Sequence, residues 1–350
     1  MRYNKYVRIW LIIGCVLVFF QVFIGGVTRL TGSGLSITKW EIVTGTLPPL
    51  TADAWEEAFD LYKATPQYEK INEGMPLADF KFIYFWEYFH RLWARMMGLI
   101  FLFPFLYFLF KKWLDKWMTR QLMLVIFWAM MAAVFGIIMV MSGLVDRPWV
   151  NAYKLSLHLG IALATFSYLI WGTYRAHDCH VSAVNNARLY RLAKIFFVLL
   201  CIQIFFGAIL SGMRAALYYP SWPDMNGQYL PEVLLDAQSW RLENLVDYDK
   251  DALMPALIHV LHRNLGYIVY GVGLYLCIKI FRYPLRKSFY RAAILLILLL
   301  NAQVILGIMT LLNSQATIPL FYGVMHQAVA ICILALALYN LFVYKRRQYA

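Results

Sequence analysis

The chain has 350 residues, of which 62% are hydrophobic and 15% are charged, and its formal net charge is +13. Soluble globular domains are far less apolar, so this composition excludes that class and predicts a polytopic membrane protein. A large positive charge can indicate nucleic-acid binding. Here its distribution indicates membrane topology and contact with lipid head groups instead, and no nucleic-acid partner is expected.

Apolar runs long enough to cross about 30 Å of hydrocarbon recur along the chain. The first run is too long for a signal peptide, and no small-residue cleavage site follows it, so we expect it to be retained. The expected fold class is therefore an all-α membrane protein. Its eight transmembrane helices are expected near residues 9–27, 82–110, 121–145, 153–174, 194–213, 254–281, 290–312 and 319–344.

The basic residues gather on one side of this arrangement. Both termini and the loops near 111–120, 175–194 and 279–291 carry 19 of the 32 Lys and Arg, but only Asp115 and Asp178 of the 19 acidic residues. Since basic loops remain inside, both termini are expected in the cytoplasm. No transit peptide is evident, so the expected location is the inner membrane of a bacterium.

The eight spans divide into two similar sets of four. The first span of each set ends in a related phrase, Gln21–Gly25 and Gln203–Gly207, and span seven contains a third copy, Gln303–Gly307. A long outer loop follows each first span, roughly at 30–80 and 214–252, and helical stretches are expected in these loops near Ala52–Lys63 and Pro231–Leu242. The sequence therefore predicts a duplication that gives two pseudo-symmetric four-helix bundles. Their expected boundaries are 1–175 and 190–350, joined by a cytoplasmic linker at 176–189.

Four histidines repeat with this duplication: His90, His158, His262 and His326. They lie on spans two, four, six and eight, which all enter the membrane from the outer side, about 8–12 Å below its surface at ~1.5 Å per residue. A polar ring in hydrocarbon needs a partner. Four rings at matching depth predict one facing pair in each bundle. Facing imidazoles hold haem iron on both axial sides, so two haem sites are expected towards the outer face.

Glu87 is the one carboxylate expected inside a span, and it lies three residues before His90 on the same helix face. One interpretation is an ion pair with Arg91 or Arg95. The other is a proton-transfer group beside the haem edge. His259 occupies the corresponding position in the second half, so one site would carry out chemistry while the other transfers electrons.

The sequence gives less specific predictions for the other polar residues. Arg91 and Arg263 directly follow two of the histidines and could contact haem propionates or reach the outer surface. His177, Cys179 and His180 are metal-ligand types, but their spacing fits no zinc motif. No CxxCH motif is present, so any haem is expected to bind non-covalently.

Several longer phrases resemble the haem A synthase family, membrane enzymes that convert haem O to haem A for terminal oxidases. No cysteine pair occurs in the first outer loop, as in the mitochondrial and Gram-negative-type branch of that family. The phrases cover nearly the whole chain in the family's order. They are GGVTRLTGSGLSITKW (25–40), EYFHR (87–91), GIIMVMSGL (136–144), YKLSLHLGIAL (153–163), GAILSGMRAALYYPSWPDMNG (207–227), HRNLG (262–266) and IPLFYGVMHQ (318–327).

The resemblance implies a specific assignment of the two sites. His262 and His326 would hold a resident haem b, with Arg263 beside them, and His90 and His158, with Arg91, would surround the haem O substrate. Glu87 would lie near the C8 methyl group that is oxidised in turn to alcohol, hydrate and aldehyde. The expected partners are haem O, membrane lipid, the farnesyltransferase that produces haem O and a second copy of the chain. No motif identifies the electron donor.

Two other classes compete with this interpretation. A di-haem b-type cytochrome that only transfers electrons would also carry four histidines. A transporter built from repeated halves would have spans interrupted by Gly or Pro, and Pro104 is the one clear mid-span proline. The haem extracted from the protein separates the synthase from the cytochrome.

Overall fold

The computed structural model describes residues 3–39, 47–145, 147–177, 184 and 186–344. Within those ranges there is no β-strand, and eight helices are long and apolar enough to cross a membrane. The prediction of an all-α membrane protein with eight spans is therefore confirmed. The spanning helices are α1 (Lys5–Leu30), α3 (Leu77–Phe110), α4 (Lys116–Met141), α5 (Ala152–Ala176), α6 (Ala187–Gly212), α8 (Leu253–Phe281), α9 (Lys287–Leu312) and α10 (Leu320–Tyr344).

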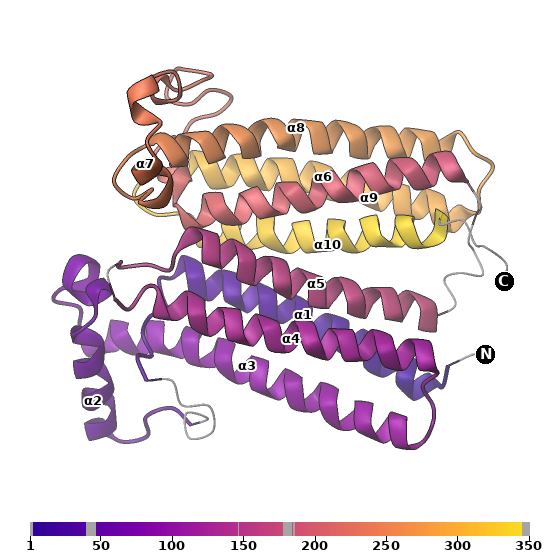
Figure 1. The fold of residues 1–350 in the computed structure, drawn as a ribbon, viewed down its shortest axis with the longest axis horizontal. Helices are drawn as coiled ribbons and strands as arrows, with labels where there is room; N and C mark the ends of the chain where they lie inside the picture. Colours follow the sequence, from indigo (N-terminus) through magenta and orange to yellow (C-terminus); the bar gives the residue numbers. More distant parts are fainter. Residues whose placement is uncertain (1–2, 40–46, 146, 178–183, 185, 345–350) are drawn as a thin grey trace.

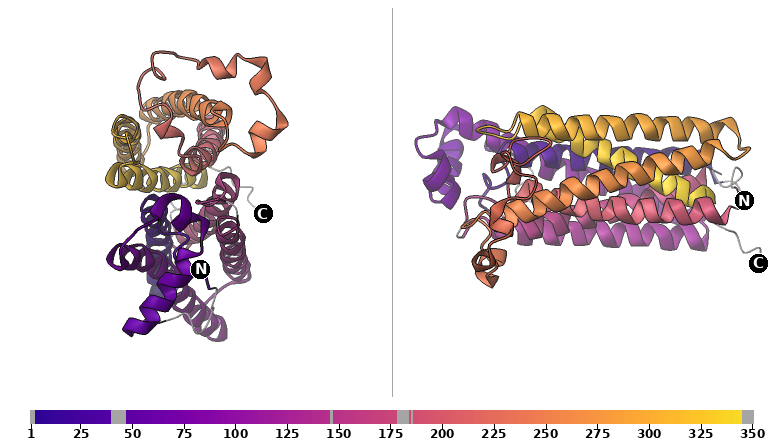
Figure 2. Two further views of the ribbon diagram at one scale, coloured as in Figure 1. Left: turned by 90° about the vertical axis from the view of Figure 1, so that its left-hand side faces the viewer. Right: turned by 90° about the horizontal axis from the view of Figure 1, so that it is seen from above.

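The eight helices run side by side in two groups. Helices α1, α3, α4 and α5 form one group and α6, α8, α9 and α10 the other, as the end-on view in Figure 2 shows. Helix α1 begins and helix α10 ends at the same end of the molecule, and the long connections lie at the opposite end (Figure 1). This arrangement agrees with an even number of crossings. The assignment of the shared end to the cytoplasm remains a prediction from the charge distribution.

Helix α3 begins at Leu77, five residues before the expected span. At ~1.5 Å per residue its length exceeds the ~30 Å hydrocarbon core. Its first turns pack against α2 (Ala52–Lys63), where Phe59 and Tyr62 of α2 and Phe80 of α3 form a separate buried cluster. Helix α2 has the predicted bounds, and Thr51 caps it by accepting a hydrogen bond from the Ala54 backbone N–H.

The second outer loop differs from the prediction of a helix near Pro231–Leu242. Two short 3-10 turns, Glu232–Leu234 and Ala237–Ser239, come before the short helix α7 (Leu242–Val246). The side chain of Asp236 accepts a hydrogen bond from the Gln238 backbone N–H. Such local side-chain bonds compete with helix formation, which explains why the prediction was wrong.

The two groups of helices repeat most of their internal packing. Helix α1 packs on α3 and α5 as α6 packs on α8 and α10, and α4 packs on α5 as α9 packs on α10. The groups meet where α1 packs on α10 and where α5 packs on α6 and α10. There the amide Nε2 of Gln327 donates to the Val22 carbonyl oxygen at 2.6 Å. This repetition supports the proposed duplication, while the exact boundaries at 175 and 190 remain predictions.

Candidate functional site

The structure brings the predicted histidine pairs together, one in each group of helices. The rings of His262 on α8 and His326 on α10 have their centres 6.5 Å apart. Two imidazoles that bind one metal ion at roughly 2.0 Å from each side would have centres about 6.4 Å apart. His90 on α3 and His158 on α5 lie close enough to interact electrostatically. The donor set therefore fits haem iron, and the role of these side chains as ligands remains a prediction.

Each of the four rings lies against a glycine of another spanning helix. An added Cβ at Gly25 or Gly136 would lie 3.1 Å from the ring of His90 or His158, respectively. The corresponding distance is 2.8 Å for Gly207 with His262 and for Gly307 with His326. A larger residue at Gly207 or Gly307 would displace the ring, and one at Gly25 or Gly136 would require the ring to move by a few tenths of an ångström. The glycines therefore leave space for each imidazole at its observed position.

Hydrogen bonds define the protonation of the rings on α5 and α10. The Nδ1 atom of His158 lies 2.9 Å from the Ala132 carbonyl oxygen, and Nδ1 of His326 lies 3.0 Å from that of Gln303. A carbonyl oxygen only accepts, so each Nδ1 carries the hydrogen. Each Nε2 then keeps its lone pair, which is the form that binds a metal, with the second-shell bond to a carbonyl that orients metal-bound histidines.

Glutamine amides contact three of the four rings. The Nε2 atoms of Gln21, Gln203 and Gln303 lie 2.9, 3.3 and 3.1 Å from Nε2 of His90, His262 and His326, respectively. Each glutamine precedes its glycine by four residues. Helix α4 carries the fourth glycine, Gly136, and has Ala132 instead of a glutamine four residues before it. The repeated Gln-x-x-x-Gly phrase was visible in the sequence, but its relation to the histidines was not predicted.

Glu87 is 3% exposed, and the structure holds both of its oxygens. Oε2 accepts hydrogen bonds from the Ser36 backbone N–H and hydroxyl, both at 2.7 Å, and from the Ile37 N–H at 2.9 Å. Oε1 accepts from the guanidinium of Arg91, which also donates to the Ile37 carbonyl oxygen at 3.3 Å. Of the two interpretations of Glu87, the ion pair is therefore present, with Arg91 as the partner. It joins α3 to the start of the first outer loop beside His90.

Arg263 has a similar place in the second half. Its Nη1 donates to the carbonyl oxygens of Pro223 and Asp224 at 2.6 and 2.7 Å, and its Nη2 donates to that of Ser221 at 3.1 Å. A hydrogen bond from the Ser221 hydroxyl holds the pKa of Asp224 below its usual range. The guanidinium of Arg263 thus fixes the second outer loop, and contact with a haem propionate remains a prediction for both arginines.

The two other histidines that the structure describes, His177 and His259, do not join the pairs. His259 is 4% exposed, and its ring centre lies 6.2 Å from that of Tyr219 in the second outer loop. His177 contacts α1 through the side chain and carbonyl oxygen of Arg8. Cys179 and His180 lie outside the described residues. Among the residues that are described, no three His, Cys, Asp or Glu side chains form a metal-binding group.

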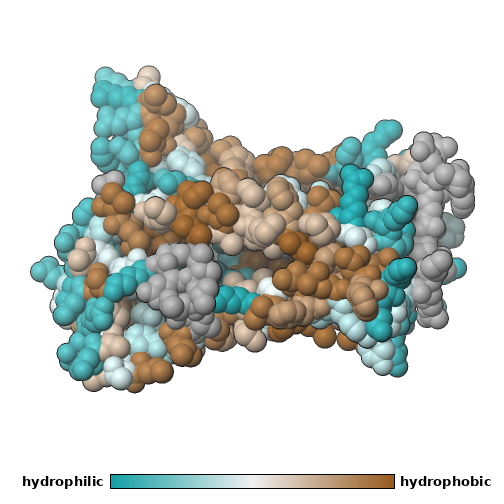
Figure 3. All heavy atoms as spheres, turned by 60° about the horizontal axis from the view of Figure 1, so that its bottom comes forward, coloured by the Kyte–Doolittle hydropathy of each residue, from teal (hydrophilic) through white to brown (hydrophobic). Residues whose placement is uncertain are grey.

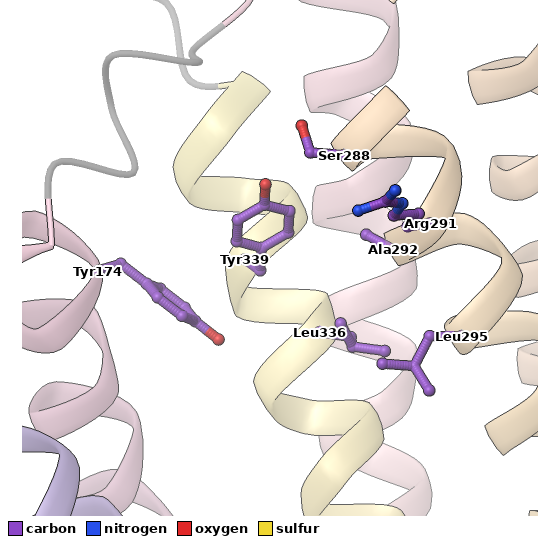
Figure 4. A pocket seen from close by; sticks show the side chains of 7 residues that line it. All are labelled: Tyr174, Ser288, Arg291, Ala292, Leu295, Leu336 and Tyr339. Carbon is purple, nitrogen blue, oxygen red and sulfur yellow. The ribbon is translucent and has the colours of Figure 1, made fainter. Parts of the chain in front are cut away.

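A pocket of about 330 Å³ lies at the other end of the molecule, where the termini are. Tyr174 of α5, Arg291 of α9 and Tyr339 of α10 border it, as Figure 4 shows, and the hydroxyl of Tyr174 donates to the Ala335 carbonyl oxygen at 2.8 Å. Its lining is mainly apolar and contains none of the predicted site residues. We therefore place the functional site at the histidine pairs.

Substituting Gly307 tests how tightly the second pair is fixed. We expect Gly307→Ala to displace His326, because overpacking costs about 1–3 kcal/mol and the new methyl group has no free space. The visible spectrum of haem bound in the second half should lose its bis-imidazole form. Gly271→Ala on α8 is the matched control, because no atom lies within 4 Å of the added Cβ. An unchanged spectrum for Gly307→Ala would contradict the assignment of His326.

Together these features define a polytopic membrane protein with one two-histidine site in each half of a duplicated bundle. The chain belongs to the COX15-CtaA family of cytochrome oxidase assembly proteins, whose family model matches residues 8–338.

Curated relatives extend along almost the full length of this chain. A haem A synthase from Flavobacterium psychrophilum is 38% identical, with 97% of this chain and 98% of that protein covered. The haem A synthase of Flavobacterium johnsoniae is 39% identical, with 97% of each chain covered. That of Nitrosospira multiformis is 37% identical, with 96% of this chain and 92% of that protein covered.

Proposed function

We propose that this chain is a haem A synthase of a bacterial inner membrane, which oxidises the C8 methyl group of haem O to a formyl group. The observation that carries the proposal is the occurrence of two histidine pairs in a chain that belongs to this family and is similar along its length to haem A synthases. Haem O is the substrate, and a resident haem b is the cofactor.

The resident haem b is assigned to His262 and His326, and haem O to His90 and His158. Two differences between the halves support this order. Glu87 lies near the first pair, whereas His259 occupies its position near the second. The helices around the second pair pack on all sides, which suits a cofactor that stays bound, whereas α3 and α4 around the first pair do not pack closely together.

The conversion of a methyl to a formyl group removes four electrons and adds one oxygen atom, in successive steps through the alcohol and the hydrate. When bound, the resident haem b would carry electrons one at a time between the substrate site and a redox partner. The chain itself provides three functions. Histidine Nε2 atoms would hold the two porphyrins, the glycines leave space for the imidazole rings, and Glu87 would exchange protons near the reacting carbon while it fixes the outer segment at Ser36 and Ile37.

Haem extraction from a suitable host tests this function. The chain is expressed in a bacterium that makes haem O but has no haem A synthase of its own, and the extracted haems are separated by chromatography. We expect a formyl haem with the mass of haem A, and its absence in cells that express His158→Ala. If only haem B and haem O appear while the protein contains bound haem, the chain is an electron-transfer cytochrome and the proposal is wrong.

A further inference from the structure

The two halves differ at one helix–helix contact. In the second half α8 packs along α9, whereas the corresponding helices α3 and α4, both fully described, do not pack closely along their lengths. In the most apolar stretch of each helix, 28% of α8 and 17% of α9 are buried, against 11% of α3 and 6% of α4. The first half is therefore open on the side where the second half is closed.

Specific residues account for the closed contact in the second half. The hydroxyl of Tyr270 on α8 donates to Oδ1 of Asn301 on α9 at 3.1 Å. One turn further along, Leu300 of α9 lies against Gly273 of α8, where an added Cβ would lie 2.7 Å from it. A hydrogen bond and a side chain that fills the space above a glycine thus join the two helices.

The first half has different residues at each of these places. The His90/His262 alignment pairs Gly98 with Tyr270, and the Gly136/Gly307 alignment pairs Met130 with Asn301. No heavy atom lies within 4 Å of a Cβ built on Gly98, and Met130 is 58% exposed. The glycine on α3 and the exposed methionine on α4 therefore leave a gap between these two helices at Gly98 and Met130.

The contact between Gly273 and Leu300 also has no counterpart in the first half, where Phe101 and Ala129 occupy the corresponding positions. The ring of Phe101 points to α1, where it lies 4.6 Å from the ring of Trp10 and packs beside Gly14. Ala129 is too small to reach across from α4. Figure 3 views the side of the molecule on which α3 and α4 lie, and its apolar surface is hollowed in the middle.

We propose that this gap between α3 and α4, at Gly98 and Met130, holds the isoprenoid tail of haem O. The inference rests on the proposed function. Gly98 lies eight residues from His90 on α3, so the gap is about 12 Å along the helix from the first-half site. It opens on apolar side chains towards lipid, which suits a hydrocarbon chain. Only the half assigned to the substrate has it, and haem b carries no such tail.

The gap acts by steric fit. Lipid chains are as apolar as the helices, so an isoprenoid chain gains little by leaving lipid for the gap. The tail is attached to the porphyrin, however, and must leave the bundle when the porphyrin lies between His90 and His158. A closed α3–α4 contact would force the tail into packed side chains. Closing the gap should therefore exclude haem O and still admit haem B.

The test transplants the closed contact of the second half into the first. The double variant Gly98→Tyr, Met130→Asn is purified as the full chain in lipid nanodiscs and titrated with haem O and, separately, with haem B. We expect the affinity for haem O to fall by about tenfold or more and that for haem B to change by less than about twofold. Gly271→Tyr on α8 is the matched control, because that position is also open, and it should change neither affinity.

Each other outcome has a defined meaning. An unchanged haem O affinity, or equal losses for haem O and haem B, would overturn the inference. A smaller oligomer with unchanged haem O affinity would also overturn it and would show that the gap is a contact between copies of the chain. The spectrum of the second-half haem reports whether the variant is folded, and Gly98→Phe alone replaces the double variant if it is not.

The titration measures binding and needs no turnover, so it is independent of the proposed function. If the wild-type chain makes haem A but the double variant shows no selective loss of haem O affinity, this inference alone is contradicted. If the wild-type chain makes no haem A, the proposed function is contradicted.

Discussion

His158→Ala should abolish haem A formation while the protein keeps its second-half haem. Removal of an outer-shell partner of a metal ligand already costs about 10–100-fold, so loss of the ligand itself should lower product by more than about 100-fold. His326→Ala should instead remove the resident haem from the purified protein, and with it the electron path between the substrate site and the redox partner. Both variants are measured by haem extraction and by the visible spectrum of the purified protein.

Replacing His177 with alanine provides the control for these variants. It contacts Arg8 at the end of the molecule that carries the termini and takes part in neither pair. Its loss should leave both the spectrum and the product unchanged. If His158→Ala and His326→Ala had identical spectra, the assignment of one haem to each half would be contradicted.

Glu87→Gln should stop haem A formation without loss of haem O binding. Glutamine keeps the size of the side chain and one hydrogen-bond acceptor, but it cannot take up a proton. General acid–base groups contribute about 10²–10⁴-fold, and we expect the rate to fall within that range. Alanine is the less informative substitution here. Both substitutions remove the charge that pairs with the mostly buried guanidinium of Arg91, and breaking such a pair costs about 3–5 kcal/mol in stability. Alanine also removes the hydrogen-bond acceptor that glutamine keeps, so its loss of activity would have two causes.

Two further variants separate proton transfer from loop anchoring. Glu87→Asp keeps the charge and should retain part of the activity. Ser36→Ala removes one donor to Oε2 and leaves the carboxylate in place, so its rate should stay within about threefold of wild type. If Ser36→Ala lost as much activity as Glu87→Gln, the carboxylate would act by fixing the outer segment and its role in proton transfer would be contradicted.

The eight spans could be predicted because apolar runs separated by charged loops are a strong local signal. The ends of the helices were less predictable. Helix α3 continues outwards to Leu77 because its first turns pack on α2, and a hydropathy pattern does not contain that contact. The segment near Pro231–Leu242 has helical composition but forms separate turns, since the Asp236 side chain binds the backbone locally.

The histidines could be predicted because they repeat with the duplication, whereas their surroundings depend on contacts between distant segments. Glu87 receives backbone N–H bonds from Ser36 and Ile37, about fifty residues away, and no spacing rule predicts that. The relation of each ring to a glycine was also missed. The Gln-x-x-x-Gly phrase marked three of these glycines, but Gly136 has Ala132 in place of the glutamine and so escaped the pattern.

The asymmetry between the halves was not predicted either, because a duplication invites the assumption of equal packing. Tyr270 and Asn301 in the second half, and their counterparts Gly98 and Met130 in the first, are each ordinary residues for a membrane helix. Only the alignment of the two halves, placed on the structure, shows that one contact is closed and its counterpart is open.

The most direct test of the central claim is the haem content and axial ligation of the purified wild-type chain supplied with haem O and haem B. Haem is quantified by the pyridine haemochrome method, and ligation is determined by near-infrared magnetic circular dichroism. Two haems per chain, with bis-imidazole ligation that His326→Ala removes from the second half, is the predicted result. A colourless protein, or a haem whose ligation survives loss of His326 and of His158 alike, would contradict it.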